Sequence, residues 1–439
     1  MMRAHMSTAT VATEKSSLVR AMTRWDLTAL AINGIIGSGI FGLPATAAKL
    51  LGFGSPIAFG ICALIVYVFV LCFAEAASHF SDSGGPYLYG RTIFGSFIGF
   101  EVGWSVWLAR VSAFATNSGI FVSYLAFFFP QIASGLGRTA ILILVPAILA
   151  YINIRGVRGG AKFGGVLAIL KLSALVLFGA IGLAYVDWGR FSTATIPANA
   201  NWGIAILGLI YTFTGFEYAV IPAAEAKNPR RDLGWALIIA LGVCTVIYLA
   251  VQVVALGTLP LEQLTASARP LADAGRSFMG PVAGALIATV ACISIIGNLS
   301  ALVLVSPRLT LAFAERRDVP TVFAKLHPSY GTPTVSIIFF TTIGSMLAIY
   351  GSFQWLVITS VVARLANYIV TCLAVPIMRV KSEEPPRFRI PLGPVIPVVG
   401  VILCIWLFGQ APTDTKTAFG IACLVGALLY LARPRSQTT

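Results

Sequence analysis

Long blocks of apolar residues, separated by short polar segments, fill most of this chain. A block of about 20 apolar residues is long enough to cross a lipid bilayer as a helix. We therefore predict an all-α polytopic membrane protein with twelve transmembrane helices. Their predicted limits are 27–48, 55–80, 95–128, 139–155, 162–186, 203–224, 233–258, 280–313, 333–351, 353–379, 394–411 and 416–432.

The composition agrees with this prediction. Of the 439 residues, 58% are hydrophobic and 10% are charged, whereas a soluble domain carries about 25% charged residues. The net charge of +14 would suggest a nucleic-acid partner for a soluble protein. Here the charges concentrate in alternate loops, which indicates membrane topology instead. The expected surroundings are therefore membrane lipid, and no nucleic-acid partner is expected.

The distribution of basic residues predicts the orientation. When the N-terminus is placed in the cytoplasm, most of the 30 Lys and Arg residues fall in cytoplasmic segments. Cytoplasmic loops of membrane proteins carry such an excess. We predict a multi-pass protein of the plasma or inner membrane with both termini cytoplasmic. The predicted parts are a cytoplasmic tail at 1–24, two repeats at 25–186 and 203–379, a helix pair at 394–432 and a second tail at 433–439.

The first predicted span is interrupted. Residues 33–44 read Asn-Gly-Ile-Ile-Gly-Ser-Gly-Ile-Phe-Gly-Leu-Pro, and glycine and proline both weaken a helix. Lipid offers no partner for freed backbone N–H and C=O groups, so a broken helix survives in a membrane only where it lines a protected cavity. Glycines here are equally expected for close helix packing.

The sixth predicted span carries a similar interruption. Residues 211–222 read Tyr-Thr-Phe-Thr-Gly-Phe-Glu-Tyr-Ala-Val-Ile-Pro. With five spans in each half of the chain, the first and sixth spans occupy corresponding positions. Interrupted helices at corresponding positions of two halves indicate an inverted-repeat transporter. The second break therefore favours a binding site over simple packing at the first.

The chemistry of two facing breaks suits an α-amino acid. A half-helix that begins at a break exposes N–H groups and the positive end of its dipole, which attract a carboxylate. A half-helix that ends there exposes carbonyl groups, which attract an ammonium. Ser38 adds a hydroxyl donor, and Gly37 and Gly39 let a ligand approach the backbone.

Several motifs together resemble the amino acid–polyamine–organocation (APC) transporters. The resemblance implies a leucine-transporter-type fold of 5+5 inverted repeats, with helices 1 and 6 discontinuous and two further helices after them. It also implies alternating access by one helix bundle moving against a scaffold. The motifs are Gly-Ser-Gly-Ile-Phe at 37–41, Thr-Gly-Phe-Glu at 214–217 with Glu225 and Asn228-Pro229-Arg230, Glu75 with Ser83-Gly84-Gly85-Pro86-Tyr87, and the segment from Arg308 to Pro320.

The resemblance assigns roles to residues at both breaks. It implies that Ser38 and Gly39 bind the substrate carboxylate, and that the carbonyls of Ile35, Tyr211 and Thr214 hold the amine. Tyr211 stands where the family often has an aromatic side chain that closes over the substrate. The predicted substrate-binding residues are Ile35, Gly37, Ser38, Gly39, Ile40, Tyr211, Thr212, Thr214 and Gly215.

Lys171 lies midway along the fifth predicted span. Burial in a membrane penalises the charged form of an amine. In several family members a similar lysine occupies the space where sodium-coupled relatives hold an ion. The hypothesis is that Lys171 replaces sodium, either as a proton carrier or as a fixed cation. The alternative is that its side chain extends to the cytoplasmic interface.

Other polar residues lie within the predicted spans. Glu217 can gate, couple protons or cap freed N–H groups, so Lys171, Glu217 and Tyr211 form the predicted coupling and gating set. Arg110 and Arg364 must face protein or water, with Glu217, Glu101 and Glu75 as candidate partners. Polar residues interpreted as interhelical hydrogen bonders rather than ligands are Ser112, Asn117 and Asn298.

A neutral L-amino acid is the first-choice substrate, because the predicted pocket holds no acidic cluster beyond Glu217. The apolar residues expected near it are Trp104, Trp107, Phe216, Ile295 and Ile296. The alternative is an antiporter of cationic amino acids or polyamines. A membrane-embedded enzyme would need a catalytic cluster, and an ion channel a repeated pore loop; neither is seen. No metal or cofactor is expected, a proton is a candidate coupling ion, exchange is equally open, and the assembly is predicted as a monomer or homodimer.

Overall fold

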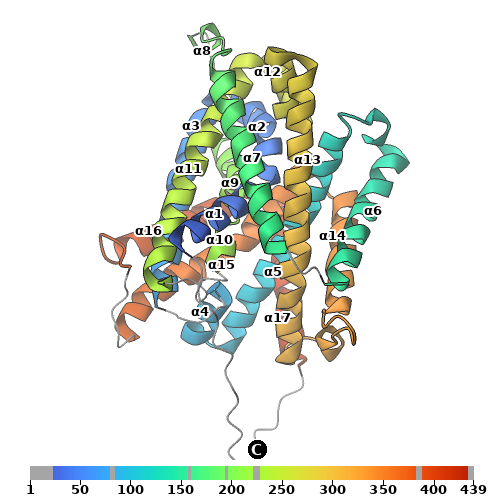
Figure 1. Ribbon diagram of the computed structural model, residues 1–439. Coiled ribbons are helices and arrows are strands. Elements are labelled where there is room, and N and C mark those ends of the chain that lie inside the picture. The colour runs from blue at the N-terminus through green and yellow to red at the C-terminus, as the bar shows by residue number, and fades with distance from the viewer. Residues whose placement is uncertain are drawn as a thin grey trace, which may run out of the picture.

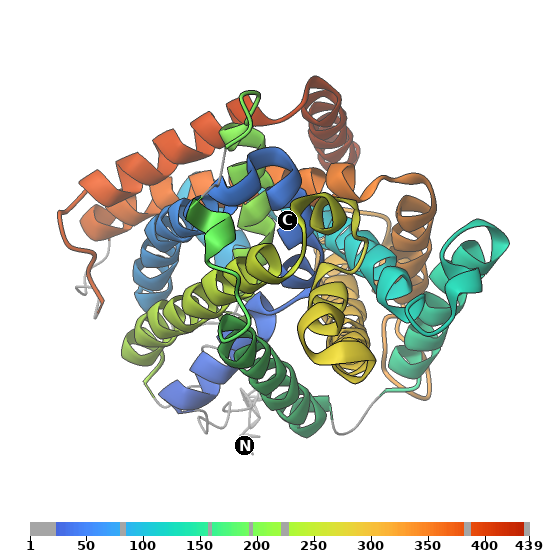
Figure 2. The same ribbon diagram turned by 90° about the horizontal axis from the view of Figure 1, so that it is seen from above.

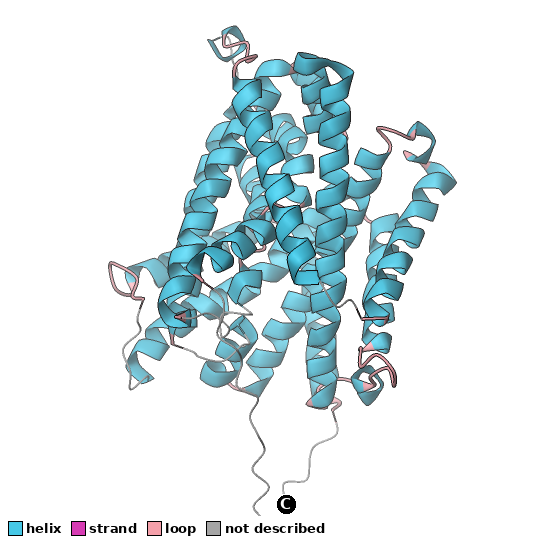
Figure 3. Cartoon of the chain, viewed as in Figure 1, coloured by secondary structure: helices cyan, strands magenta, loops and turns pink. Residues whose placement is uncertain are grey.

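The computed structural model describes residues 23–79, 85–156, 160–192, 196–220, 228–381 and 388–433. Within these ranges every regular element is a helix and none is a strand (Figure 3). The longer helices run side by side in one bundle (Figure 1). The all-α prediction is therefore confirmed for this part of the chain.

Helices occupy all twelve predicted apolar blocks. Two blocks contain a pair of short helices, α1 (Arg24–Ile35) with α2 (Ser38–Leu51), and α9 (Trp202–Phe213) with α10 (Glu217–Val220). The other ten contain α3 (Ser55–Ser78), α5 (Ser96–Leu125), α6 (Gly135–Ile154), α7 (Gly160–Leu183), α11 (Pro229–Thr258), α13 (Pro270–Glu315), α14 (Thr334–Tyr350), α15 (Phe353–Lys381), α16 (Val395–Gln410) and α17 (Thr413–Leu431).

Length and composition support a multi-pass membrane protein. Among the described residues, six helical stretches are long and apolar enough to cross a membrane, and four shorter apolar helices accompany them. Short connecting helices lie at opposite ends of the bundle, α4 (Gly85–Phe94) at one end and α8 (Gly189–Ser192) with α12 (Leu261–Ala266) at the other (Figure 1). The division into twelve spans and two inverted repeats stays a prediction.

The helices α2 and α9 lie at the centre of the bundle, and α1 extends from there to its edge (Figure 2). All described residues of α9 except Trp202 and Ile204 are buried, and so are most residues of α2. The two helices contact each other and are enclosed by α3, α5, α13 and α15. A Cβ atom added to Gly39 would lie 2.8 Å from the Cα atom of Thr212, so glycine is what allows α2 to approach α9 so closely.

A buried ion pair joins α3 to α15 near the end of the bundle where α4 lies. Both Glu75 carboxylate oxygens accept from the Arg379 guanidinium, at 2.5 and 2.8 Å, and the backbone N–H of Ile390 donates at 2.7 Å. This bidentate pairing satisfies a carboxylate with no exposed surface. Glu75 was a candidate partner for Arg110 or Arg364, and the structure pairs it with Arg379 instead.

Candidate functional site

The first break separates α1 from α2 at two residues. Ile36 has ψ 85°, and Gly37 has φ −113° and ψ −157°, so neither continues the helix. No side chain that the structure describes caps the N-terminus of α2. The first N–H groups of a helix have no intrahelical partner, so those of Ser38, Gly39 and Ile40 remain available to a ligand. The predicted interruption of the first span is confirmed.

Carbonyl groups at the end of α1 are bonded by two side chains from other helices. The Lys171 ammonium donates to the carbonyls of Asn33 at 2.6 Å and Ile36 at 2.7 Å. The Tyr248 hydroxyl on α11 donates to the carbonyl of Ile35 at 3.0 Å. Lys171 is 2% exposed, so its side chain does not extend to the interface. It satisfies carbonyls that the break would otherwise leave unpaired.

The second break separates α9 from α10. Gly215 has a φ of +106°, a conformation that L side chains rarely adopt. The backbone N–H of Gly215 donates to the Glu217 carboxylate at 2.6 Å, so Glu217 caps an N–H group freed by the break. Motif residues Ser83, Gly84, Pro222 and Glu225 lie outside the described residues.

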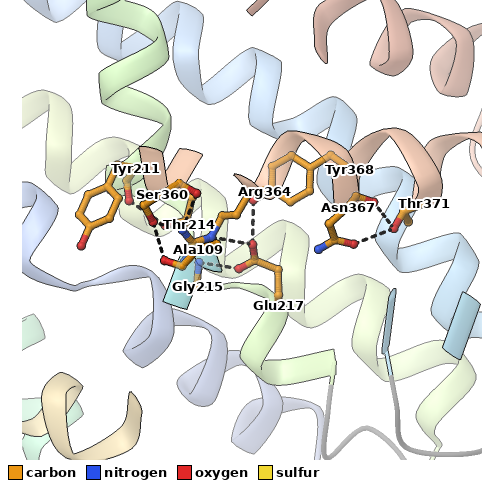
Figure 4. Close-up of polar contacts among 10 residues, drawn as sticks. All are labelled: Ala109, Tyr211, Thr214, Gly215, Glu217, Ser360, Arg364, Asn367, Tyr368 and Thr371. Carbon is orange, nitrogen blue, oxygen red and sulfur yellow. Dashed lines mark hydrogen bonds and ion pairs between the residues drawn. The ribbon is translucent and has the colours of Figure 1, made fainter. Parts of the chain in front are cut away.

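Glu217 is also held by α15 (Figure 4). Its carboxylate lies 3.5 Å from the Arg364 guanidinium and accepts from the Tyr368 hydroxyl at 2.8 Å. Arg364 also donates to the Ser360 carbonyl and hydroxyl. Of the pairings that the sequence left open, the structure therefore selects Glu217 with Arg364. The acid beside the second break is charge-neutralised and firmly positioned.

The two breaks touch each other. A Cβ atom added to Gly215 would lie 2.2 Å from the carbonyl oxygen of Gly34, which is closer than any real contact. The backbones of the two interrupted helices can meet here only because residue 215 is glycine. This contact brings the N-terminus of α2, the C-terminus of α1 and the end of α9 to one place.

A cavity of about 330 Å³ lies at this meeting point. Its lining includes seven of the nine predicted substrate-binding residues, Ile35, Gly37, Ser38, Gly39, Tyr211, Thr214 and Gly215. Ile40 and Thr212 do not line it; the Thr212 hydroxyl donates to its own helix at Leu209. Lys171 does not line the cavity, because its ammonium contacts the carbonyls of Asn33 and Ile36. Glu217 does not line it either, but its ion-pair partner Arg364 does.

The remaining lining residues come from α1, α5, α13 and α15. Leu30, Asn33 and Gly34 belong to α1, Ala113 and Asn117 to α5, Arg364 to α15, and the rest to α13. Among the described residues, no carboxylate side chain lines this cavity. The α13 lining residues are Asn298, Ala301, Leu302 and Val305.

The residues expected near the pocket from sequence do not line it. Trp104 donates through its indole N–H to the Ala422 carbonyl on α17, at 2.8 Å. The others absent from the lining are Trp107, Phe216, Ile295 and Ile296. Sequence reasoning missed Tyr248, and it interpreted Asn298 as a packing residue. The sequence did carry one signal, because Asn298, Ala301 and Val305 are spaced three and four residues apart and therefore share one face of a helix. A polar residue on such a face could have indicated that the face lines a cavity.

Tyr211 links three walls of the cavity. Its hydroxyl lies 3.3 Å from the Ser38 hydroxyl and accepts from the Asn117 amide at 3.1 Å. The side chain therefore joins α9 to α2 and α5 beside the free N–H groups. This position agrees with the predicted gating role without testing it.

Two interrupted helices that meet at a central cavity, in a chain whose described regular elements are all helices with apolar spans among them, define a membrane transporter rather than an enzyme. The chain belongs to the amino acid permease family, whose sequence profile matches residues 22–429.

Relatives across nearly the whole length carry transporter names. The chain is 29% identical to the methylthioribose transporter of Bacillus subtilis (strain 168), over 99% of this chain and 97% of the relative. It is 28% identical to the branched-chain amino acid permease BcaP of the same organism, over 97% and 95%. It is 26% identical to the serine/threonine exchanger SteT, also from that organism, over 94% and 96%.

Proposed function

We propose that this protein is a secondary active transporter that moves a neutral L-amino acid across the cell membrane by alternating access. The observation that carries the proposal is the 330 Å³ cavity at the contact between the two broken helices. A zwitterion placed there finds backbone donors for its carboxylate and carbonyl acceptors for its amine. Both recognition elements come from backbone, so they act on any amino acid regardless of side chain.

The carboxylate is assigned to the N-terminus of α2. No side chain caps this terminus, and the helix dipole favours a negative charge there. Ser38 contributes its hydroxyl from the same turn, already oriented by Tyr211. A preformed set of donors loses little entropy when the ligand binds.

The amine is assigned to the carbonyls of Ile35, Tyr211 and Thr214. In this structure the Ile35 carbonyl accepts from Tyr248 and from the Gly37 N–H, and the Tyr211 carbonyl accepts from the N–H and hydroxyl of Thr214. A carbonyl oxygen has two lone pairs. A bound ammonium therefore has to replace at least one internal donor, which couples substrate binding to rearrangement at the breaks.

The cavity extends from the breaks along α1 to Leu30 and along α13 to Val305, toward the end of the bundle that carries α4 (Figure 1). The excess of Lys and Arg on that side supports the proposal that this end lies in the cytoplasm together with both termini. A second cavity, of about 350 Å³, is lined by Gly42, Thr46 and Lys49 on the other side of the breaks. In alternating access the central site opens to one side at a time, and a cavity on each side of the breaks supports this proposal.

Neutral substrates are favoured by the charges at the cavity. Among the described residues its lining contains Arg364 and no carboxylate, so a cationic side chain or a polyamine would meet no partner for its charge there. This weighs against the antiporter alternative. The relatives' names include a branched-chain amino acid permease and a serine/threonine exchanger, and they do not select one neutral side chain.

Sodium independence is proposed from Lys171. Its ammonium lies against the carbonyls of Asn33 and Ile36, the kind of oxygen ligands that a bound cation would use at the end of a half-helix. A covalently attached cation at this position removes the need for a free one. Proton symport and exchange both fit this arrangement.

Uptake of labelled amino acids into proteoliposomes tests the proposal. We expect saturable uptake of one or more neutral amino acids, without sodium, and competition by unlabelled substrate. Arginine, lysine and putrescine should compete weakly. Imposing a pH gradient, or preloading the vesicles with substrate, distinguishes symport from exchange. Failure of the whole panel to produce saturable uptake in correctly inserted protein would contradict the proposal.

A further inference from the structure

Two asparagine side chains at the cavity have unused hydrogen-bonding capacity. Asn117 lines it from α5 and Asn298 from α13. Asn298 makes no side-chain hydrogen bond to any residue that the structure describes. A Cβ atom added to Gly37 would lie 2.7 Å from the side-chain amide nitrogen of Asn298. The Asn298 amide therefore faces the first break.

The Asn117 amide has a fixed orientation. Its nitrogen donates to the Ala113 carbonyl at 2.7 Å and to the Tyr211 hydroxyl at 3.1 Å. If the amide were rotated by 180°, its oxygen would face the Ala113 carbonyl and lose that bond. The oxygen is therefore the atom left over, and it has no partner in the described part of the chain.

An unpaired amide oxygen at this position is costly. Asn117 is only 4% exposed, so bulk water does not replace the missing partner. An unsatisfied buried polar group costs about 1–3 kcal/mol, and such groups are rare in native proteins. A donor that the substrate brings against this oxygen, after a small movement of the Asn117 side chain, would remove this cost on binding.

The type of donor is narrowed by the rest of the site. A carboxylate has no proton to donate. The ammonium is drawn to the carbonyls at the ends of α1 and α9, whereas α5 contributes no backbone to either break. Asn117 therefore faces the part of the substrate beyond its amino and carboxylate groups. The neighbouring wall residues Ala113 and Ala301 are small, which leaves room for a short side chain.

We propose that the substrate is a small neutral amino acid with a side-chain hydroxyl, and that Asn117 accepts the hydrogen bond of that hydroxyl. Asn298 is the second polar group of the same pocket. The inference rests on the proposed transport function and specifies its substrate class. A site built around a buried acceptor discriminates strongly against an analogue that lacks the donor.

Threonine and valine are the discriminating pair, because they have nearly the same shape and differ by one hydroxyl. In proteoliposomes containing the full-length protein, kcat/KM for L-threonine should exceed that for L-valine by roughly tenfold or more. L-serine should be preferred over L-alanine by a similar factor. Equal values, or a preference for valine, would overturn the inference and leave amino acid transport intact.

Asn117→Leu removes the acceptor at nearly constant volume. We expect the threonine-to-valine ratio to fall to about one, through loss of threonine transport rather than gain of a new fold. Asn153→Leu is the matched control. Asn153 is buried on α6 and donates to its own helix at Leu149, at 2.8 Å, away from the cavity. Its replacement should leave the ratio unchanged.

Other outcomes are separable. If Asn117→Leu lowers threonine and valine transport by the same factor while the protein stays monodisperse, Asn117 acts on the amine or on the site's shape, and the inference is wrong. Should Asn117→Leu fail to fold, Asn117→Ala gives a second reading of the ratio, and a ratio that stays at the wild-type value overturns the inference. If wild-type protein transports no amino acid, the proposed function itself fails.

Discussion

Replacing Lys171 with methionine will lower the initial rate of uptake at least tenfold while the protein remains folded. The ammonium is the donor to two buried carbonyls at the end of α1, at 2.6 and 2.7 Å. Without it both carbonyls lose a charged donor, and each unsatisfied buried group costs about 1–3 kcal/mol. The conformation with α1 in its present position therefore becomes less stable, by a comparable free energy, than the other conformations of the protein. Initial rates in proteoliposomes, with the best substrate from the uptake panel at saturation, measure the effect.

Lys416→Met is the control for this substitution. The Lys416 ammonium also donates to a carbonyl, that of Gly409 at 2.7 Å, but at the surface of the protein. We expect its replacement to have little effect, because water replaces the lost donor. If Lys171 carries a proton, the wild-type rate will change with pH and the residual rate of Lys171→Met will not. Uptake by Lys171→Met at the wild-type rate and pH profile would contradict the proposed role.

Gly215→Ala will abolish measurable uptake. The added Cβ would lie 2.2 Å from the Gly34 carbonyl oxygen, and neither backbone can move without opening the contact between the two breaks. A φ of +106° is also strained for alanine. The substrate site depends on this contact, so we expect loss of binding before loss of the fold. Uptake together with the size-exclusion profile of purified protein measures both.

Two glycines provide matched controls. Gly208 lies on α9, a few residues before the break, and a Cβ atom there would meet nothing within 4 Å. Gly280 has a φ of +79° with the same open surroundings, so Gly280→Ala reports strain without a clash. Both variants should retain most of their activity. Activity of Gly215→Ala comparable to theirs would show that close contact of the breaks is dispensable.

Much of the fold could be predicted because the membrane restricts the options. Lipid requires continuous apolar helices, so hydrophobic runs alone located a helix in every block. The breaks were predictable for the same reason, since Gly37, Gly39 and Gly215 in apolar runs conflict with an unbroken helix. The backbone part of the site followed from these breaks.

Side-chain contacts between helices could not be predicted in the same way. Periodicity shows which residues share a face, and it does not show which faces meet. The sequence therefore left Arg364 with three possible acids, of which the structure selects Glu217. It could not show that Tyr248 reaches the Ile35 carbonyl, because the two residues are far apart along the chain and any buried tyrosine would look the same.

The pocket wall was the least predictable part. Trp104 and Trp107 were expected at the cavity, but neither lines it, and Trp104 contacts α17 instead. Asn117 and Asn298 resemble ordinary interhelical hydrogen bonders in the sequence. Only the three-dimensional arrangement shows an amide oxygen without a partner beside the breaks.

Ligand-induced stabilisation of the purified protein tests whether the two breaks recognise both the carboxylate and the ammonium of an amino acid. The best substrate from the uptake panel is compared with its carboxamide, which lacks the carboxylate, and its N-acetyl form, which lacks the ammonium. A ligand at 100 times its Kd stabilises the folded state by about 2.7 kcal/mol. We expect the parent amino acid to raise the unfolding temperature, and neither analogue to do so at the same concentration. Equal stabilisation by either analogue would contradict recognition of both backbone charges at the two breaks.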